Sequence, residues 1–329
     1  MPTGDLQYDP AGFDTELRTA LDDIRIGRWR STRELLDKTP TWAQRTARSQ
    51  VLASAAARSD AVEAWGRESQ DRQYWMMWAR VLVQRALHAY RSGQLHEAHL
   101  LADAARRACE EASRLMPYDP VPWVAWLALA PLDSPHPGER RPENRVQCWE
   151  PGIPLGPWGL LWEAHRRDEF NREAWHRAMH ALLAYEASAH SAVSYSRWAA
   201  QLAPRGSAVI VLPLYTHLER FRRRTNRDET PRLHWAPSVI SFYTLRALDE
   251  WFRFSDDTTW SPLDLNYLAQ ALHHGGHPAR DVFEAIGNCV TRTPWQDVAP
   301  RGRTWQEEFR QARLLRLRES GPPRAGGRM

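Results

Sequence analysis

The apolar residues of this chain recur at three- and four-residue spacing, which is the period of an α-helix. The first such stretch predicts a helix over residues 13–26 that ends at Gly27. Its apolar face consists of Phe13, Leu17, Leu21 and Ile24. No stretch of the sequence alternates apolar and polar residues with the period of two that a half-buried strand requires. The pattern therefore predicts an all-α protein.

Glycine and proline divide the rest of the sequence into further helical stretches. These cover residues 29–37, 41–58, 74–91, 95–115, 121–130, 158–165, 171–204 (a pair), 207–224, 237–254, 262 to the Gly275-Gly276 break, 278–286 and 305–318. Proline and glycine are concentrated in residues 131–157, which predicts an inserted loop. The predicted organisation is N-terminal helical repeats over 1–130, this loop, C-terminal helical repeats over 158–318 and a disordered tail over 319–329.

Residues 171–204 contain the clearest pair of helices. Their facing apolar positions are Trp175, Met179, Leu182, Tyr195 and Trp198. This spacing resembles a tetratricopeptide repeat, a helix-turn-helix unit of about 34 residues that buries its apolar face by stacking on neighbouring units. Other pairs, such as 74–115, match the pattern in part. The resemblance implies a right-handed superhelix of antiparallel helix pairs with a concave groove, and it places Trp175 in the core.

The basic residues are almost all of one kind. Lys38 is the only lysine among 44 basic residues, so 43 are arginine. Two explanations of this bias are open. One is codon usage in a GC-rich genome, and the other is a need for guanidinium groups, which bind carboxylates at two points. The net charge of +4 is small for 329 residues and does not indicate a nucleic-acid-binding protein. The 17 tryptophans lie mostly in helical stretches, where large rings fill the gaps between stacked helices.

Cysteine usage and hydropathy bear on the compartment. Cys109, Cys148 and Cys289 are dispersed, which disfavours a disulfide framework or a cysteine zinc site and fits a reducing cytosol. The first ten residues have no apolar core of a signal peptide. The longest uncharged apolar run, 121–132, is too short to span a bilayer. We expect a cytoplasmic protein that is not inserted in a membrane.

The resemblance implies which side chains line the groove, because the first helix of each repeat faces it. The polar residues at the implied positions are Glu173, His176, His180, His217, Asn266, Gln270 and His273. Three interpretations remain open: groove-lining contacts, ordinary surface residues, or a metal site at His176 and His180, which share a helix face. A zinc site needs three or four ligands and local spacing supplies two, so no metal and no other cofactor is predicted. With ordinary histidine pKa values, binding of an acidic ligand would weaken as the pH rises from about 6 to 8.

The densest basic run is Arg220, Arg222, Arg223 and Arg224. Cations near the C-terminal end of a helix complement its dipole, which is one interpretation. The other is a site for the carboxylates or phosphates of an acidic partner.

Catalytic motifs are missing from the sequence. It has no GxSxG elbow and no Walker loop, and His96 and His99 lack the spacing of a zinc-protease helix. The leading hypothesis is therefore a cytoplasmic scaffold that binds a protein or peptide segment in its concave groove. An acidic segment is one candidate partner, and a regulatory role is one option. The alternative is an all-helical enzyme or a small-ligand receptor with a pocket lined by histidine and tryptophan. Nucleic-acid binding ranks third, and no membrane partner is expected.

Overall fold

The computed structural model describes residue 6 and residues 9–186, 189–223 and 231–318. This part of the chain is helical and contains no β-strand, so the prediction of an all-α protein is confirmed. The tetratricopeptide-like superhelix remains a prediction. Arg224 and the tail 319–329 lie outside the described residues. No helix in these described ranges is both long enough and apolar enough to cross a bilayer.

The α-helices are α1 (Thr15–Arg25), α2 (Arg30–Lys38), α3 (Trp42–Ala56), α4 (Ala61–Glu68), α5 (Arg72–Arg91), α6 (Leu95–Leu115), α7 (Val121–Leu127), α8 (Trp158–His165), α9 (Arg172–Tyr185), α10 (His190–Leu202), α11 (Leu212–Arg223), α12 (Pro231–Trp235), α13 (Ser238–Arg246), α14 (Pro262–Gly275), α15 (Arg280–Ile286), α16 (Arg292–Val298) and α17 (Trp305–Arg318). Short 3₁₀ turns are η1 (Ala130–Leu132), η2 (Pro137–Glu139), η3 (Pro142–Asn144), η4 (Ala208–Val211) and η6 (Asp257–Thr259), and η5 (Ala247–Phe252) is a π-helical turn.

Periodicity failed to predict three short helices: α4, α12 and α16. Helix α4 contains Gly66, a residue that usually weakens a helix. A Cβ atom at this position would lie 2.5 Å from Cε2 of Tyr74, so the glycine lets the Tyr74 ring pack directly on α4. The glycine that hides α4 in the sequence is therefore the residue that allows α4 to dock on α5.

The predicted inserted loop, 131–157, is built from η2, η3 and one bridge between Val146 and Gly156. Arg140 holds it together. Its guanidinium donates hydrogen bonds to the main-chain oxygens of Ser134 (2.9 Å), Pro135 (2.6 Å) and Leu155 (3.0 Å). The same group lies 3.6 Å from the ring centroid of Tyr185 at the end of α9. The loop is thereby fastened to α9.

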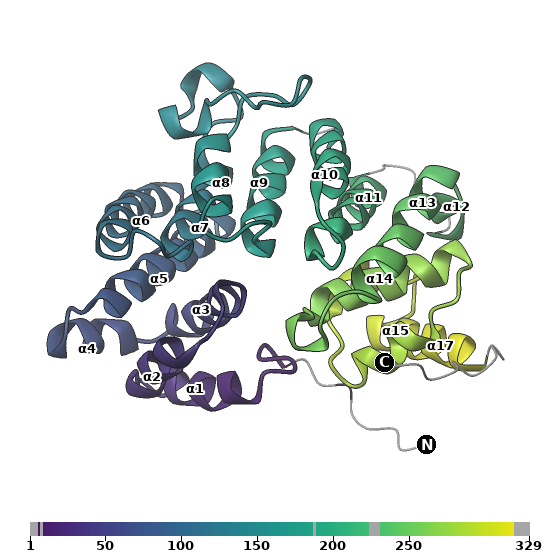
Figure 1. Cartoon of the computed structure of the whole chain (residues 1–329), viewed down its shortest axis with the longest axis horizontal. Helices are drawn as coiled ribbons and strands as arrows, with labels where there is room; N and C mark the ends of the chain where they lie inside the picture. The colour runs from purple at the N-terminus through teal and green to yellow at the C-terminus, as the bar shows by residue number, and fades with distance from the viewer. Residues whose placement is uncertain (1–5, 7–8, 187–188, 224–230, 319–329) are drawn as a thin grey trace.

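The helices follow one another around an arc whose two ends meet (Figure 1). The turn before α1 contacts the first turn of α14: Gly12 has a φ of +57°, and a Cβ there would lie 2.7 Å from Cγ of Pro262. Leu6 also packs against the C-terminal core. Glycine at position 12 is required both by its left-handed backbone and by this close approach.

Arginine–carboxylate pairs join helices that are far apart in the sequence. Arg45 contacts Asp119 at 2.7 Å, and Arg48 contacts Asp14 at 2.7 Å. Two further pairs reach α9 from other helices, Arg80 to Glu173 and Arg172 to Asp264. The planar guanidinium donates several hydrogen bonds in a fixed geometry, which lysine does not provide. The arginine bias of the sequence therefore has a structural use, whatever its origin.

Candidate functional site

Helix α9 carries the histidines that the sequence singled out. Its N-cap is Asn171, whose side-chain oxygen accepts from the Ala174 amide at 3.0 Å. The Asn171 amide group donates to Oγ1 of Thr46 on α3 at 3.1 Å, which fixes the start of α9 against the N-terminal helices. Arg172, His176 and His180 then follow at four-residue spacing and share one helix face.

Arg172 begins this face with a buried hydrogen-bonded group. Its Nε and Nη2 atoms donate to the two carboxylate oxygens of Asp264 on α14, at 2.5 and 2.7 Å. The Tyr215 hydroxyl on α11 donates to the same carboxylate at 2.5 Å. Burial acts to lower the pKa of Arg172, but the charge of Asp264 outweighs it and raises the pKa above its ordinary value. Burial and the Asp264 charge raise the pKa of Tyr215 as well, so Arg172 stays charged and Tyr215 stays neutral near pH 7.

His176 is buried against this group. Its ring meets the Tyr215 ring edge-on at 4.5 Å, and Nε2 lies 3.9 Å from the Asp264 carboxylate. That nitrogen has no hydrogen-bond partner among the described residues. Burial, followed by the charge of Arg172, lowers the pKa of His176 well below its ordinary value. The ring is therefore neutral near pH 7.

His180 is exposed, yet burial is the first cause that lowers its pKa, to about 4, with Arg177 adding to the effect. Its imidazole lies at the protein surface, where the charges of Arg177, Glu219 and Arg172 act on it. We use the name α9 recess for the residues on and around this face of α9, namely Arg172, His176, Arg177, His180, Tyr215, Glu219 and Asp264. The lowered pKa values favour neutral imidazoles near pH 7 and differ from the ordinary values behind the expected weakening of acidic-ligand binding between pH 6 and 8, which stays a prediction.

Glu173 does not face open solvent. Its two carboxylate oxygens accept from Arg80 on α5 at 2.8 and 2.9 Å, and Arg177 donates to Oε1 at 3.0 and 3.1 Å. Burial would raise the pKa of Glu173, but the two guanidinium charges outweigh it and lower the pKa. One carboxylate is thus shared by two arginines, and the group keeps a net positive charge beside His180.

The other predicted residues lie in different surroundings. His217 is completely buried, and burial together with Arg197 lowers its pKa to about 3. Asn266 donates to the main-chain oxygens of Pro262 and Cys289 and accepts from the Trp295 indole at 2.8 Å, which is a structural role. The charges that shift the pKa values of His180, His217 and His273 are three different sets.

Gln270 and His273 lie further along α14, toward α17. Gln270 is buried, and His273 contacts His274 and Arg316. The structure therefore keeps Glu173, His176 and His180 together on α9 and places His217, Asn266, Gln270 and His273 elsewhere.

The basic run does not act as one patch. Arg222 pairs with Glu219 at 2.9 Å and with Asp297 at 3.3 Å. Arg223 pairs with Glu219 and donates to the main-chain oxygens of Leu183 and Glu186 at the end of α9. These bonds fasten α11 to α9, and they use the cations that a ligand would otherwise meet.

Sequence reasoning missed most partners in the α9 recess: Arg172, Arg177, Tyr215, Glu219 and Asp264. One available signal was Arg172, which lies four residues before His176 and so on the same helix face. Asp264 gave no local signal, since it reaches Arg172 from 92 positions along the chain.

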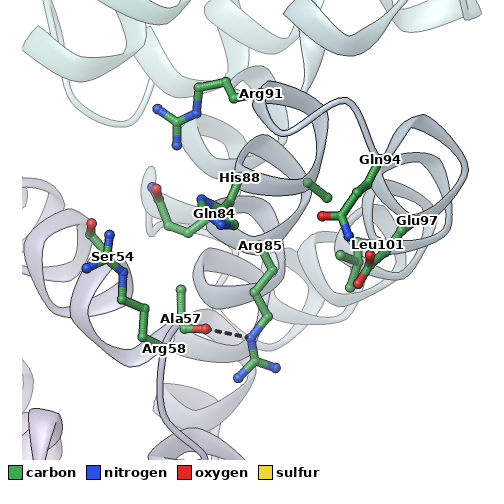
Figure 2. Close-up of a pocket in the computed structure, with 11 residues that line it drawn as sticks. Ser54, Ala57, Arg58, Gln84, Arg85, His88, Arg91, Gln94, Glu97 and Leu101 are labelled. Carbon is green, nitrogen blue, oxygen red and sulfur yellow. Dashed lines mark hydrogen bonds between the residues drawn. The ribbon is translucent and has the colours of Figure 1, made fainter.

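A second feature is a cavity of about 370 Å³ at α3, α5 and α6, which the sequence did not predict. Figure 2 shows Arg58, Arg85, His88 and Arg91 around it, with Gln84 among them. We call it the arginine cavity. Arg85 is held by the main-chain oxygens of Ala57 (3.2 Å) and Ser59 (2.9 Å) and by Glu63 (2.5 Å). Arg58, His88 and Arg91 are exposed.

Comparisons with protein-family models, curated proteins and solved structures found no match to this chain. The resemblance to tetratricopeptide repeats therefore rests on residues 171–204 and on the helix pairs around them.

Proposed function

We propose that this chain is a binding module, a tetratricopeptide-like scaffold that holds an acidic segment of a partner protein in the α9 recess. The observation that carries the proposal is the sharing of Glu173 by Arg80 and Arg177. This leaves one positive charge of the Arg80–Glu173–Arg177 group without a carboxylate of its own near His180. The other carboxylate that acts on His180, Glu219, pairs with Arg222 and Arg223. Consecutive antiparallel pairs such as α5–α6 and α9–α10 support the scaffold architecture.

The partly exposed guanidinium of Arg177 gives the recess its preference for a ligand carboxylate. Its side chain is 18% exposed, so part of the guanidinium can meet a ligand while Glu173 holds the rest. A carboxylate placed there receives a charge-assisted hydrogen bond in surroundings that are partly shielded from water. The neutral imidazole of His180 adds a hydrogen-bonding group without a charge of its own.

Binding fits the recess better than acid–base catalysis. General acids and bases work best with a pKa near the operating pH. The pKa values of His176 and His180 lie far below 7, and that of Tyr215 lies far above its ordinary value. These three groups hold fixed protonation states near neutrality, which suits a site that recognises a ligand.

The test uses a phage-displayed library of random 12-residue peptides panned against the purified chain. We expect the selected peptides to be rich in aspartate and glutamate. A synthetic selected peptide should bind Arg177→Gln about tenfold more weakly, the equivalent of about 1.4 kcal/mol, because one charge-assisted hydrogen bond is lost. Arg80 still pairs with Glu173 in this variant, so the fold is retained.

The matched control is Arg107→Gln, which removes an exposed arginine from α6, outside the recess. It removes the same charge and should bind the peptide like the wild type. Selected peptides without acidic residues, or equal loss in both variants, would reject the α9 recess as the binding site.

A second candidate function is reception of a small anion in the arginine cavity. Its volume falls at the lower end of the range for small-molecule sites. The lining combines three arginines, two glutamines and His88 with the carboxylate of Glu97 and a few small or apolar residues. No tryptophan is among its described lining residues, so it differs from the histidine- and tryptophan-lined pocket expected for the alternative function. Titration with inorganic pyrophosphate separates the two functions: Arg91→Gln should weaken pyrophosphate binding and leave the acidic peptide unaffected.

A further inference from the structure

The end of α14 and the start of α17 bring three potential metal ligands together. His273 and His274 occupy the last turn of α14, and Glu308 lies in the first turn of α17. One ligand atom from each residue lies within 4.8 Å of the other two. The two imidazole rings are nearly perpendicular, with centroids 4.9 Å apart. This group lies apart from the α9 recess and from the arginine cavity.

Neighbouring groups orient two of the three ligands. Nδ1 of His274 lies 3.0 Å from the main-chain oxygen of Gln270 and 3.2 Å from the Gln270 side-chain nitrogen. In the tautomer with the proton on Nδ1, that proton is donated to the main-chain oxygen and the lone pair of Nε2 is free. Nε2 lies 3.7 Å from Oε1 of Glu308, which is too long for a hydrogen bond. The other carboxylate oxygen, Oε2, accepts from Arg303 at 2.8 Å. Each ligand is thus held on its far side and presents an open atom to the other.

We propose that His273, His274 and Glu308 bind Zn²⁺. Two imidazole nitrogens and one carboxylate oxygen are a common zinc ligand set, and a water molecule would take the fourth position. Zinc bonds of about 2.0–2.2 Å separate tetrahedral ligand atoms by about 3.3 Å. The distance between His274 and Glu308 is already near that value, and His273 closes the remaining gap by a side-chain rotation.

Arg316 is the group that competes with the metal. Its Nε lies 3.3 Å from Nδ1 of His273, and its Nη2 donates to the main-chain oxygen of His273 at 2.7 Å. Zinc displaces at most the longer of these contacts, and the bond to the main chain can persist. The positive charges of Arg316 and Arg303 lower the affinity, so the site is weaker than a zinc site flanked by carboxylates.

The consequence of zinc binding is a link between α14 and α17, the last helix of the described chain. Sequence reasoning expected no metal because local spacing supplied only two ligands, at His176 and His180. The set found here gave no local signal, since adjacent histidines do not share a helix face and Glu308 lies 34 positions beyond His274. The link would stabilise the packing of Phe309 and Ala312 against the C-terminal core, where both are buried.

The test titrates the full chain, freed of metal by dialysis against EDTA, with ZnCl₂ in a calorimeter. We expect one equivalent to bind and to raise the Tm by roughly 3 °C at saturation. Co²⁺ substitution should give the visible bands of a tetrahedral nitrogen–oxygen site. A cobalt–thiolate charge-transfer band would instead assign the metal to a cysteine and overturn the proposal.

The decisive variant is Glu308→Gln, because glutamine keeps the shape and the acceptor for Arg303 while it removes the anionic ligand. It should lose Zn²⁺ binding and keep the Tm of the metal-free wild type. His273→Ala should lose binding as well. The control His96→Ala/His99→Ala, which removes two exposed histidines from α6, should bind one equivalent. Equal zinc binding by Glu308→Gln and the wild type, or no binding by the wild type, would overturn the proposal, and neither result affects the α9 recess.

Discussion

The α9 recess and the arginine cavity both contain arginine and histidine side chains. They differ in how far the arginine charges are compensated by carboxylates. In the recess, Arg172 donates hydrogen bonds from Nε and Nη2 to the fully buried carboxylate of Asp264, and Arg177 shares Glu173 with Arg80. In the cavity, Arg85 is held by main-chain oxygens and Glu63, while Arg58 and Arg91 are exposed. The difference teaches that the number of arginines does not measure the affinity for anions. What counts is how many guanidinium groups remain uncompensated and how far water is excluded from them.

The largest expected difference between the two regions concerns stability. Glu173→Ala leaves Arg80, which is 1% exposed, with a buried and unpaired charge. We expect the free energy of unfolding to fall by about 3–5 kcal/mol, measured by urea denaturation. The matched variant at the cavity, Glu97→Ala, removes an exposed carboxylate and should change stability by less than about 0.5 kcal/mol. Similar losses in both variants would remove the distinction between the two regions.

The core behind the recess gives a second large effect. Trp175 is 1% exposed and packs against Phe170, Tyr195 and Trp198, which confirms its predicted place in the core. Trp175→Ala should lower the free energy of unfolding by about 3–5 kcal/mol, because the truncation leaves a cavity. Exposed Trp162→Ala is the comparison and should cost far less. A Trp175 variant with the wild-type Tm and no peptide binding would assign the ring to the site instead.

The pH dependence of stability gives an effect of intermediate size, at the fully buried His217 of α11, which lies outside both regions. The pKa is lowered to about 4 in His180 and to about 3 in His217, while unfolded histidine titrates near 6.5. Between pH 6.5 and these values the unfolded chain binds protons that the folded chain does not, so stability falls as the pH is lowered and levels off below the folded pKa. His217→Gln should flatten the fall in the free energy of unfolding, measured by urea denaturation, between pH 7 and 4. Equal slopes in wild type and His217→Gln would contradict the burial of a neutral imidazole.

The smallest expected effect is the change in stability caused by a substitution at the arginine cavity. Arg91→Gln changes an exposed side chain that donates one hydrogen bond to the main-chain oxygen of Leu87. We expect a change in unfolding free energy of less than about 0.5 kcal/mol, measured by urea denaturation. A loss above about 2 kcal/mol would show that the cavity, like the recess, is an internal structural contact.

The spacing of apolar residues predicted most of the helices, but it did not predict which residues of different helices contact each other. The stripes of α1, α9 and α14 were visible because their apolar residues recur at helical spacing, and glycine or proline marked their ends. Helix α4 escaped because its glycine looks like a breaker until Tyr74 is seen against it. Position along a helix also placed His176 and His180 on one face.

The state of the site depends on contacts that no local pattern carries. Arg80 and Glu173 are 93 positions apart, and only their pairing shows that Glu173 is a buried structural residue. The same applies to the pKa values of His176 and His180, which are set by burial and by arginines on the completed surface. Spacing gives the face of a helix, whereas the charge on that face is a property of the assembled molecule.

The links between distant helices are made by guanidinium groups, and this leaves the chain with very little primary-amine chemistry. Among its side chains only Lys38, exposed at the end of α2, can be acetylated, ubiquitinated or captured by an amine-reactive cross-linker. Such reagents leave the arginine pairs that join α3, α5, α9 and α14 untouched. Lysine modification therefore does not act on these arginine pairs, and a label attached at Lys38 reports from one known position at the end of α2.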